Sequence, residues 1–420
     1  MAFNYDAIII GTGQAGPSLA GRLTQAGMKI AVVERKHFGG TCVNTACIPT
    51  KTLVASAEVA HKARRAADFG VEVSPEMRVD MKRVKARKDA VSAESRVGIE
   101  RYLKGMSGCT VYEGHARFES PREVRVGKVL LSAERIFINT GGTRARSRHA
   151  GTRPGRISHQ LIDDGCGFPA PSPRHRGRQL VTEGVTVRLG AECMSVAKDK
   201  RGIKVKVSCA DEDSEVIASH LLLAIGRRPN TDDLGLDKVR RDTDKHGFII
   251  VDEQLRTSAP GIWALGDCNG KGAFTHTSCN DFEIVAANVL DGDRRSVADR
   301  IPAYPLYIDP PLGRAGLTEA EVRARGLPAL IGRRPITRVS RAVEKGETQG
   351  FMKIIVSAET TRILGAAILG TGGDEVIHGI LDVMYAGVPS MVLQKAMHIH
   401  PTVSELVPTM LGELQPLVPS

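Results

Sequence analysis

The stretch that organises this chain is Gly39-Gly40-Thr41-Cys42-Val43-Asn44-Thr45-Ala46-Cys47-Ile48-Pro49-Thr50-Lys51. It places two cysteines five positions apart, between a glycine turn and a run with helical character that ends at about Arg65. Thiols at a helix N-terminus have lowered pKa values, because the unpaired amides and the helix dipole favour the thiolate. The spacing is too wide for a thioredoxin-type pair, but it allows a disulfide if the first helical turn is opened. The stretch therefore predicts a redox-active pair, with two unrelated core cysteines as the alternative.

The segment upstream predicts a dinucleotide-binding unit. An apolar strand over residues 7–10 leads into Gly11, Gly13 and Gly16, which have the spacing Gly-x-Gly-x-x-Gly, and a helical pattern follows. The next strand ends in Glu34, about twenty residues after the loop. Glycines let backbone amides approach a pyrophosphate at a helix N-terminus, and the carboxylate can accept from a ribose hydroxyl. A chance glycine-rich turn, the alternative, does not account for this order of elements.

Length and composition are those of an ordinary globular protein. The 420 residues are 42% hydrophobic and 25% charged, which suits about two to four domains. Of the eight cysteines only Cys42 and Cys47 form a close pattern, so a reducing compartment is expected rather than a secreted disulfide scaffold. The acidic N-terminus is not a signal peptide, and no apolar run is long enough to span a membrane. We expect a cytoplasmic protein without a membrane partner.

The residues around the cysteine pair resemble the class-I pyridine nucleotide-disulfide oxidoreductases, the group of dihydrolipoamide dehydrogenase, glutathione reductase and mercuric reductase. The resemblance implies FAD as the first cofactor, with Glu34 at its adenosine ribose. It implies that Cys42 is the interchange thiol that meets the substrate and that Cys47 is the charge-transfer thiol against the flavin. Lys51 would lie near the flavin ring, one helical turn beyond Cys47 and on the same face. Ala46 departs from the family's glycine and would be strained if the position needs a positive φ or a close approach of the backbone.

Other stretches resemble the rest of the family's FAD-binding domain. Residues 135–142 resemble the strand that closes its first segment, and residues 257–267 resemble its second FAD motif, where the aspartate accepts from the ribityl chain. A turn aspartate is the alternative for that last position. The resemblance thereby adds five residues to the expected flavin contacts: Thr41, Gly114, Ala116, Gly141 and Asp267. Between these stretches the pattern predicts helices over 52–67 and 79–103, and a small antiparallel sheet formed by 110–118 and 123–126.

Residues 143–179 break this resemblance. They show no apolar periodicity, and eight arginines against two aspartates give them much of the chain's formal charge of +11. Strand patterns resume at 185–189, 203–207 and 221–230, and the last of these runs resembles the end of the family's NAD(P)H domain. No second Gly-x-Gly-x-x-Gly occurs in the sequence. A flexible insertion, a basic partner-binding arm, and an out-of-frame translation joined to an internal deletion are the three interpretations, of which we favour the last.

The C-terminal part, residues 301–420, resembles the family's interface domain. Strands are expected over 351–356 and 363–368, and helices over 376–385 and 392–397. His400 and Glu405 stand in the pattern His-Pro-Thr-x-x-Glu, which resembles the family's acid–base motif. There the histidine accepts the proton of the interchange thiol across a dimer interface, and the glutamate orients the imidazole. The neighbouring His398 is expected to be structural.

These observations predict an α/β protein with a Rossmann-type FAD-binding domain, a truncated second nucleotide-binding domain and a C-terminal α+β dimerisation domain. The expected boundaries are 1–142, 143–248, 249–300 and 301–420. We expect an FAD-dependent enzyme that passes electrons from NAD(P)H to the Cys42–Cys47 disulfide and on to a small-molecule or disulfide substrate, as a homodimer without metal or nucleic acid. The alternative is an impaired FAD-binding remnant that cannot use NAD(P)H, because a binding site for it is missing from the pattern.

Overall fold

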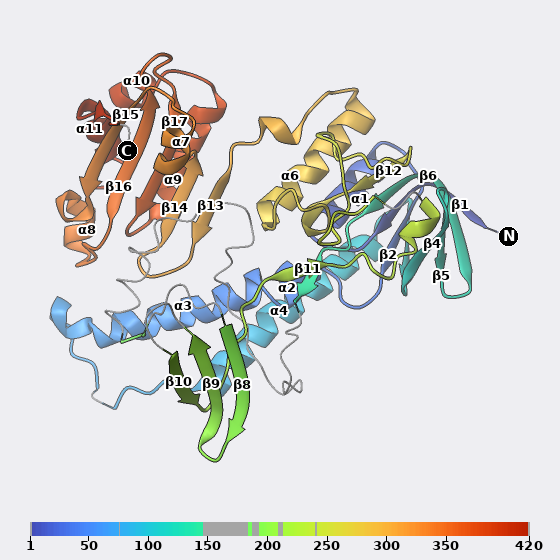
Figure 1. Ribbon diagram of the computed structural model, residues 1–420, viewed down its shortest axis with the longest axis horizontal. Helices are drawn as coiled ribbons and strands as arrows, with labels where there is room; N and C mark the ends of the chain where they lie inside the picture. Colours follow the sequence, from blue (N-terminus) through green and yellow to red (C-terminus); the bar gives the residue numbers. More distant parts are fainter. Residues whose placement is uncertain are drawn as a thin grey trace. The chain divides into compact units, whose positions relative to one another are not determined.

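The computed structural model describes residues 2–74, 76–145, 184–186, 193–208, 213–239 and 242–418. It divides into two compact units, Met1–Ala298 and Asp299–Ser420, which are described separately below and coloured along the chain in Figure 1. The gaps between residues 146 and 241 all lie in the expected second domain, residues 143–248. The four domain boundaries therefore stay predictions. The α/β class itself is confirmed.

The first unit is built on a seven-stranded sheet in the order β3-β2-β1-β6-β5-β4, with β12 paired to β6. Four of its pairs are parallel, namely β1 with β2, β1 with β6, β2 with β3, and β12 with β6. The apolar run of β1 is fully buried, as expected for a parallel strand covered on both faces. The strands of this sheet are β1 (Phe3–Ile10), β2 (Ile30–Glu34), β3 (Cys109–Glu113), β4 (Ala116–Ser120), β5 (Glu123–Val126), β6 (Val129–Ile138) and β12 (Ile262–Ala264).

One part of this sheet differs from the prediction. β4 and β5 form the expected antiparallel hairpin, but β3 lies at the other edge of the sheet, parallel to β2. The reason is a turn at Gly114, whose amide donates to the carbonyl of Glu34 at 2.8 Å. That hydrogen bond ends the β2–β3 ladder, so the apolar pattern over 110–118 belongs to two strands with different partners.

The helices of the first unit carry the cysteine stretch and frame the sheet. They are α1 (Ala15–Gln25), α2 (Gly40–Asn44), α3 (Cys47–Arg64), α4 (Met81–Lys104) and α6 (Thr275–Ala286). α3 packs along α4, and α1 packs against α6. The helix predicted from residue 52 begins five residues earlier, at Cys47, and the one predicted from 79 begins at Met81. Asp80 caps α4, because its carboxylate accepts from the amides of Lys82 and Arg83.

The segment expected to form the second nucleotide domain contains two small sheets in its described parts. β8 (Cys193–Asp199), β9 (Gly202–Ser208) and β10 (Asp213–Ala218) form an antiparallel meander, and β7 (Gly142–Arg144) pairs with β11 (Arg227–Pro229). The strand pattern over 221–230 is confirmed only near its end, where Arg227–Pro229 form β11. Residues 221–225 join none of the described sheets, and Leu222 and Ile225 are exposed. Without neighbouring strands, an apolar run cannot form a ladder. The strand predicted over 185–189 lies partly outside the described residues.

The second unit is a six-stranded antiparallel sheet with helices, in the order β13-β14-β17-β16-β15-β18. Its core contains Met352, Ile354 and Ile368 from the two central strands. The predicted strands and helices of this part are confirmed to within a few residues. Its elements are β13 (Ala303–Leu306), β14 (Leu312–Gly316), α7 (Glu319–Ala324), β15 (Ala329–Pro335), α8 (Ser340–Glu344), β16 (Phe351–Ser357), β17 (Ile363–Leu369), α9 (Gly373–Tyr385), α10 (Met391–Lys395), α11 (Leu406–Gly412) and β18 (Gln415–Pro416).

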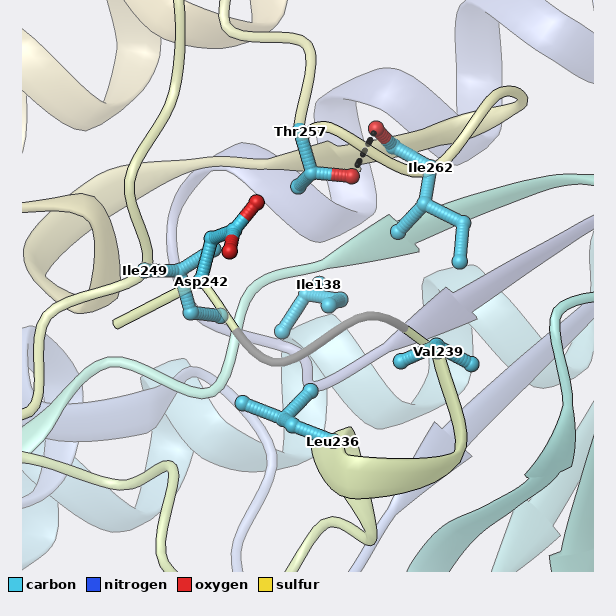
Figure 2. Close-up of a pocket in the computed structure, with 7 residues that line it drawn as sticks. All are labelled: Ile138, Leu236, Val239, Asp242, Ile249, Thr257 and Ile262. Atoms are coloured by element: carbon cyan, nitrogen blue, oxygen red, sulfur yellow. Dashed lines mark hydrogen bonds between the residues drawn. The ribbon is translucent and has the colours of Figure 1, made fainter.

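A small recess opens in the first unit at the end of β6 (Figure 2). Its wall is apolar apart from one carboxylate and one hydroxyl, and a bond from Thr257 Oγ1 to the carbonyl of Ile262 closes one side. Seven residues line it: Ile138, Leu236, Val239, Asp242, Ile249, Thr257 and Ile262. None of the predicted site residues is among them, so this recess is not the candidate site. Among the residues that the structure describes, no helix has the length and apolarity to cross a membrane.

Candidate functional site: a glycine cradle and a thiol pair

The loop between β1 and α1 has a backbone that only glycine can adopt at its tightest points. Gly11 has φ +104°, and a Cβ there would lie 2.3 Å from the carbonyl oxygen of Asn139. A Cβ on Gly16 would lie 2.5 Å from the carbonyl oxygen of Gly11. The loop is therefore folded closely against the start of α1, which leaves backbone amides facing the space before the helix. This cradle fits a pyrophosphate at a helix N-terminus.

Glu34 is held at the edge of this cradle. Its Oε2 accepts from the amide and the hydroxyl of Thr12, at 3.0 and 2.6 Å, and its Oε1 accepts from the amide of Lys36 at 2.8 Å. An ionised carboxylate has about four acceptor sites, so capacity remains for sugar hydroxyls. The amide of Gly114 donates to the backbone carbonyl of Glu34, and Ala116 begins β4 shortly afterwards. The residues expected around the adenosine thus come from the ends of strands of one sheet.

Asn139, which carries no recognisable sequence signal, connects the cradle to the second flavin segment. Its side chain is only 5% exposed, and its Nδ2 donates to the carbonyl oxygen of Gly13 at 3.1 Å. On the other side, its Oδ1 lies so close to Gly266 that a Cβ there would come within 3.3 Å. One buried amide therefore sets the spacing between the glycine loop and the residue before Asp267.

Replacing Asn139 by alanine is expected to weaken FAD binding by about tenfold or more, because the glycine carbonyls would lose their buried donor at a cost of about 1–3 kcal/mol. The measurement is the dissociation constant of FAD for the apoprotein, followed by flavin fluorescence. The matched control is Asn4→Ala, which removes an exposed asparagine from the neighbouring strand β1. Equal FAD affinity in the two variants would contradict this role.

Arg227, for which the sequence made no prediction, lies between the first and the second segment of the FAD-binding domain. Its Nη2 donates to the hydroxyl of Thr41 at 3.1 Å and to the carbonyl of Gly142. Its Nε is buried without a hydrogen-bond partner, 4.0 Å from Oδ2 of Asp267. Burial raises the pKa of Asp267, and the guanidinium opposes that shift. An orphaned donor beside a buried carboxylate fits a ligand that carries both hydroxyl and phosphate oxygens. The residues present therefore fit FAD.

Gly141 lies beside this group and makes the turn from β6 to β7. It has φ +64°, the left-handed region that glycine adopts without strain. Its carbonyl accepts from the amide of Asn230 at 3.0 Å, which ties the turn to the residues after β11. The expected flavin contact at Gly141 thus lies at the junction of the two segments.

The two cysteines occupy consecutive short and long helices. Cys42 lies within α2, and Cys47 is the first residue of α3, so the helix is interrupted between them as a disulfide would require. Cys47 Sγ lies 3.2 Å from the hydroxyl oxygen of Thr275 at the start of α6. Ala46 has φ −128°, outside the left-handed region. The condition of a positive φ is therefore not met at Ala46.

The surroundings of the two thiols give them opposite acid–base character. A hydrogen bond from Cys42, together with Thr275 and the charge of Lys51, outweighs burial and lowers the pKa of Cys47 to about 6. The same hydrogen bond, together with burial, raises the pKa of Cys42. Burial lowers the pKa of Lys51, while the neighbouring thiolates oppose that shift. In the reduced pair, Cys47 is therefore the thiolate and Cys42 the thiol, which agrees with the roles that the resemblance implies.

Alkylation of Cys47 in the reduced protein is expected to follow a titration with its midpoint near pH 6, because the pKa of Cys47 is lowered to about 6. Below this pH the thiol is protonated, and its reactivity should fall about tenfold per pH unit. Cys42→Ala removes the main donor and should raise the midpoint by about one pH unit or more. The measurement is the rate of modification by iodoacetamide, assigned by peptide fragmentation. An unshifted midpoint in Cys42→Ala would contradict the hydrogen-bond explanation.

The second unit contains the predicted acid–base pair. His400 Nδ1 lies 2.8 Å from Oε2 of Glu405, and the carboxylate side chain is 11% exposed whereas the imidazole is 74% exposed. A mostly buried carboxylate thus fixes the ring while the other ring nitrogen is left free to meet a reactant. His398 differs, because its Nδ1 lies 3.1 Å from the backbone carbonyl oxygen of Ala396. Among the described residues, no cluster of histidine, cysteine or carboxylate side chains is arranged to hold a metal.

Known proteins and family profiles match nearly the whole length of the chain. A profile of pyridine nucleotide-disulphide oxidoreductases matches residues 5–171 and 173–281, and a profile of the dimerisation domain of such proteins matches residues 302–411. A dihydrolipoyl dehydrogenase of Thermus scotoductus is 31% identical over 444 residues, which is 96% of this chain and 95% of that protein. A dihydrolipoyl dehydrogenase of Haloarcula marismortui is 30% identical over 460 residues, with 96% and 95% covered.

Solved structures of flavoprotein disulfide reductases have a similar fold. The HOCl-induced flavoprotein disulfide reductase RclA from Escherichia coli superposes with a TM-score of 0.83 at 29% identity, over 97% of this chain and 100% of that chain. LpdA from Mycobacterium tuberculosis superposes with a TM-score of 0.84 at 20% identity, over 98% and 99%, and this second likeness concerns the fold alone.

Proposed function

The chain belongs to the pyridine nucleotide-disulphide oxidoreductase family, and we propose that Cys42 and Cys47 are the redox pair through which it acts. It is a flavoprotein disulfide oxidoreductase, of a family that uses FAD and NAD(P)H. The observation that carries the assignment is the asymmetry of the two thiols, with a stabilised thiolate at Cys47 and a protonated Cys42 beside it. A pair with this asymmetry has one sulfur that suits an electron relay and one that suits attack on a substrate.

The glycine cradle, Glu34, Thr41 and Asp267 would hold FAD, which would supply two-electron exchange with the thiol pair. The chain's own residues do the thiol chemistry. Cys42 loses its proton to a base and attacks one sulfur of a disulfide substrate, which releases the first product thiol. The Cys47 thiolate then attacks Cys42 Sγ and breaks the mixed disulfide, and the second product leaves as a thiolate that takes its proton from solvent. The Cys42–Cys47 disulfide forms as the substrate disulfide is reduced, so atoms and electrons balance.

His400 is the base in this proposal. Its ring is oriented by Glu405 at 2.8 Å and is exposed within its own unit. The chain contains the family's dimerisation domain, and several apolar side chains are exposed on the same unit, among them Met397 at 98% and Ile399 at 78%. Exposed apolar side chains of this kind mark an association surface. We therefore propose a homodimer in which His400 of the partner subunit receives the proton of Cys42.

Replacing His400 by glutamine is expected to slow disulfide turnover by about 10²–10⁴-fold, the usual contribution of a general base. The FAD content should not change, because no residue of the glycine cradle is altered. The control is His398→Gln, which removes a neighbouring exposed imidazole and should leave the rate near that of the unmodified protein. A His398 variant as slow as the His400 variant would contradict the assignment of the base.

The sequence has one Gly-x-Gly-x-x-Gly, in the FAD-binding segment, and about half of the expected second domain lies outside the described residues. The alignment with the Thermus protein spans 444 positions, more than the 420 residues of this chain, so the relative has residues without a counterpart here. This agrees with the proposed internal deletion next to an out-of-frame stretch at 143–179. Resequencing the gene tests it, and the idea fails if no other frame encodes a glycine-rich nucleotide-binding unit.

The proposed function is tested with the purified protein and its bound flavin. Consumption of NADH or NADPH is followed with small disulfides, including lipoamide, as acceptors. Turnover that requires both the nucleotide and a disulfide is the expected result. Flavin that binds but is bleached by neither nucleotide would instead favour the impaired remnant, an alternative for which the comparisons give no support.

A further inference from the structure

A third cysteine lies beside the proposed redox pair. Cys279 is in the first half of α6, four residues after Thr275, and is a half-buried free thiol. Residues four apart on a helix lie on the same face, with Cβ atoms about 5–6 Å apart. Because the hydroxyl of Thr275 lies 3.2 Å from Cys47 Sγ, Cys279 lies on the face of α6 that meets the thiol pair.

The acid–base behaviour of Cys42 agrees with this placement. The charge of Cys279 contributes to the raised pKa of Cys42, and Thr275 hydrogen-bonds to both members of the pair. Three sulfur atoms therefore gather at the meeting point of α2, α3 and α6. The other free thiols of the described chain, Cys109 and Cys268, show no interaction with the pair.

We propose that Cys279 is a third redox thiol, which exchanges with the Cys42–Cys47 disulfide to form a Cys42–Cys279 disulfide. This inference rests on the proposed function of the pair. The Cys279 thiolate attacks Cys42 Sγ, the new sulfur–sulfur bond forms, and the Cys42–Cys47 bond breaks with Cys47 leaving as a thiolate. The proton of Cys279 goes to solvent. One disulfide replaces another, so the exchange needs neither an oxidant nor a reductant.

The chemistry of the three thiols gives this exchange a direction and a pH dependence. Cys47 is a good leaving group, because a thiol with a lowered pKa leaves faster. Burial raises the pKa of Cys279, and the nearby carboxylates of Glu283 and Asp281 raise it further. Little of its thiolate exists at neutral pH, so the exchange should quicken as the pH rises. In the resulting Cys42–Cys279 disulfide, Cys42 can no longer attack a substrate, and Cys47 remains as a thiolate.

Peptide mapping distinguishes the two disulfides directly. Trypsin leaves Cys42 and Cys47 together in peptide 37–51 and Cys279 in peptide 272–294, so only the proposed disulfide joins two peptides. The oxidised protein is incubated at a series of pH values, its free thiols are blocked, and the digest is analysed by mass spectrometry without reduction. The linked pair is expected to form about tenfold faster per pH unit below the pKa of Cys279.

Cys47→Ser tests the geometry independently of the exchange. In this variant, mild oxidation with diamide is expected to join Cys42 directly to Cys279. Adding Cys279→Ser should abolish the linked pair, whereas adding Cys109→Ser, the loss of another half-buried thiol, should leave it unchanged. Oxidation of Cys47→Ser without any link between 37–51 and 272–294 would overturn the inference. Absence of the Cys42–Cys47 disulfide from the unmodified protein would instead overturn the proposed function.

Discussion

Replacing Cys42 by serine is expected to abolish disulfide turnover, with kcat/KM lower by about a thousandfold or more, as when a covalent nucleophile is removed. The hydroxyl is far less acidic than a thiol and forms no mixed disulfide, so attack on the substrate is lost. Serine can still donate to Cys47, so the Cys47 thiolate should persist. The measurement is steady-state turnover of the substrate disulfide at equal flavin content.

The control for this prediction is Cys109→Ser. Cys109 is a half-buried thiol at the start of β3, and burial raises its pKa to about 11, which makes it unreactive at neutral pH. Its loss is expected to leave turnover and flavin content unchanged. Turnover that survives in Cys42→Ser, or that is lost equally in the control, would remove Cys42 from the role of the attacking thiol.

Replacing Gly11 by alanine is expected to yield a protein without bound FAD and with a free energy of unfolding lower by about 2 kcal/mol or more. The backbone at this position has φ +104°, and the added Cβ would lie 2.3 Å from the carbonyl oxygen of Asn139. The position of the Cβ is fixed by the backbone, and the oxygen belongs to the main chain, so neither can rotate away. The loop must therefore move, and the amides that face the pyrophosphate move with it.

The matched control is Gly98→Ala. Gly98 lies within α4 with open space around its Cα, so the same added methyl group should stabilise the helix by about 0.5–1 kcal/mol. Flavin content after purification and urea denaturation are measured for both variants. Full flavin occupancy in Gly11→Ala would show that the cradle does not need this backbone conformation.

Local features of the sequence carry most of what could be predicted of the site. The glycine loop and the cysteine stretch are recognisable because each is a short segment. The residues that would contact the ligand in each segment also determine its backbone conformation. His400 and Glu405 are likewise five residues apart and meet within one turn of chain. Patterns of this kind do not depend on the rest of the fold.

Asn139, Arg227 and Thr275 could not be predicted, because each reaches its partner only through the fold. Asn139 meets Gly13 across neighbouring strands, Arg227 meets Thr41 over 186 positions, and Thr275 meets Cys47 over 228. Each is a common polar residue in an ordinary local context. The strand pattern over 221–230 forms a strand only at 227–229, where β7 pairs with it. Its apolar half, residues 221–225, has a sound local pattern but joins none of the described sheets.

The central claim is that Cys42 and Cys47 form the disulfide that the flavin reduces, and differential alkylation tests it most directly. The protein as isolated is alkylated, treated anaerobically with NADH or NADPH, and then alkylated with a reagent of different mass. We predict that both cysteines of peptide 37–51 carry only the second label. Both cysteines labelled before the nucleotide is added, or neither labelled afterwards, would contradict the account.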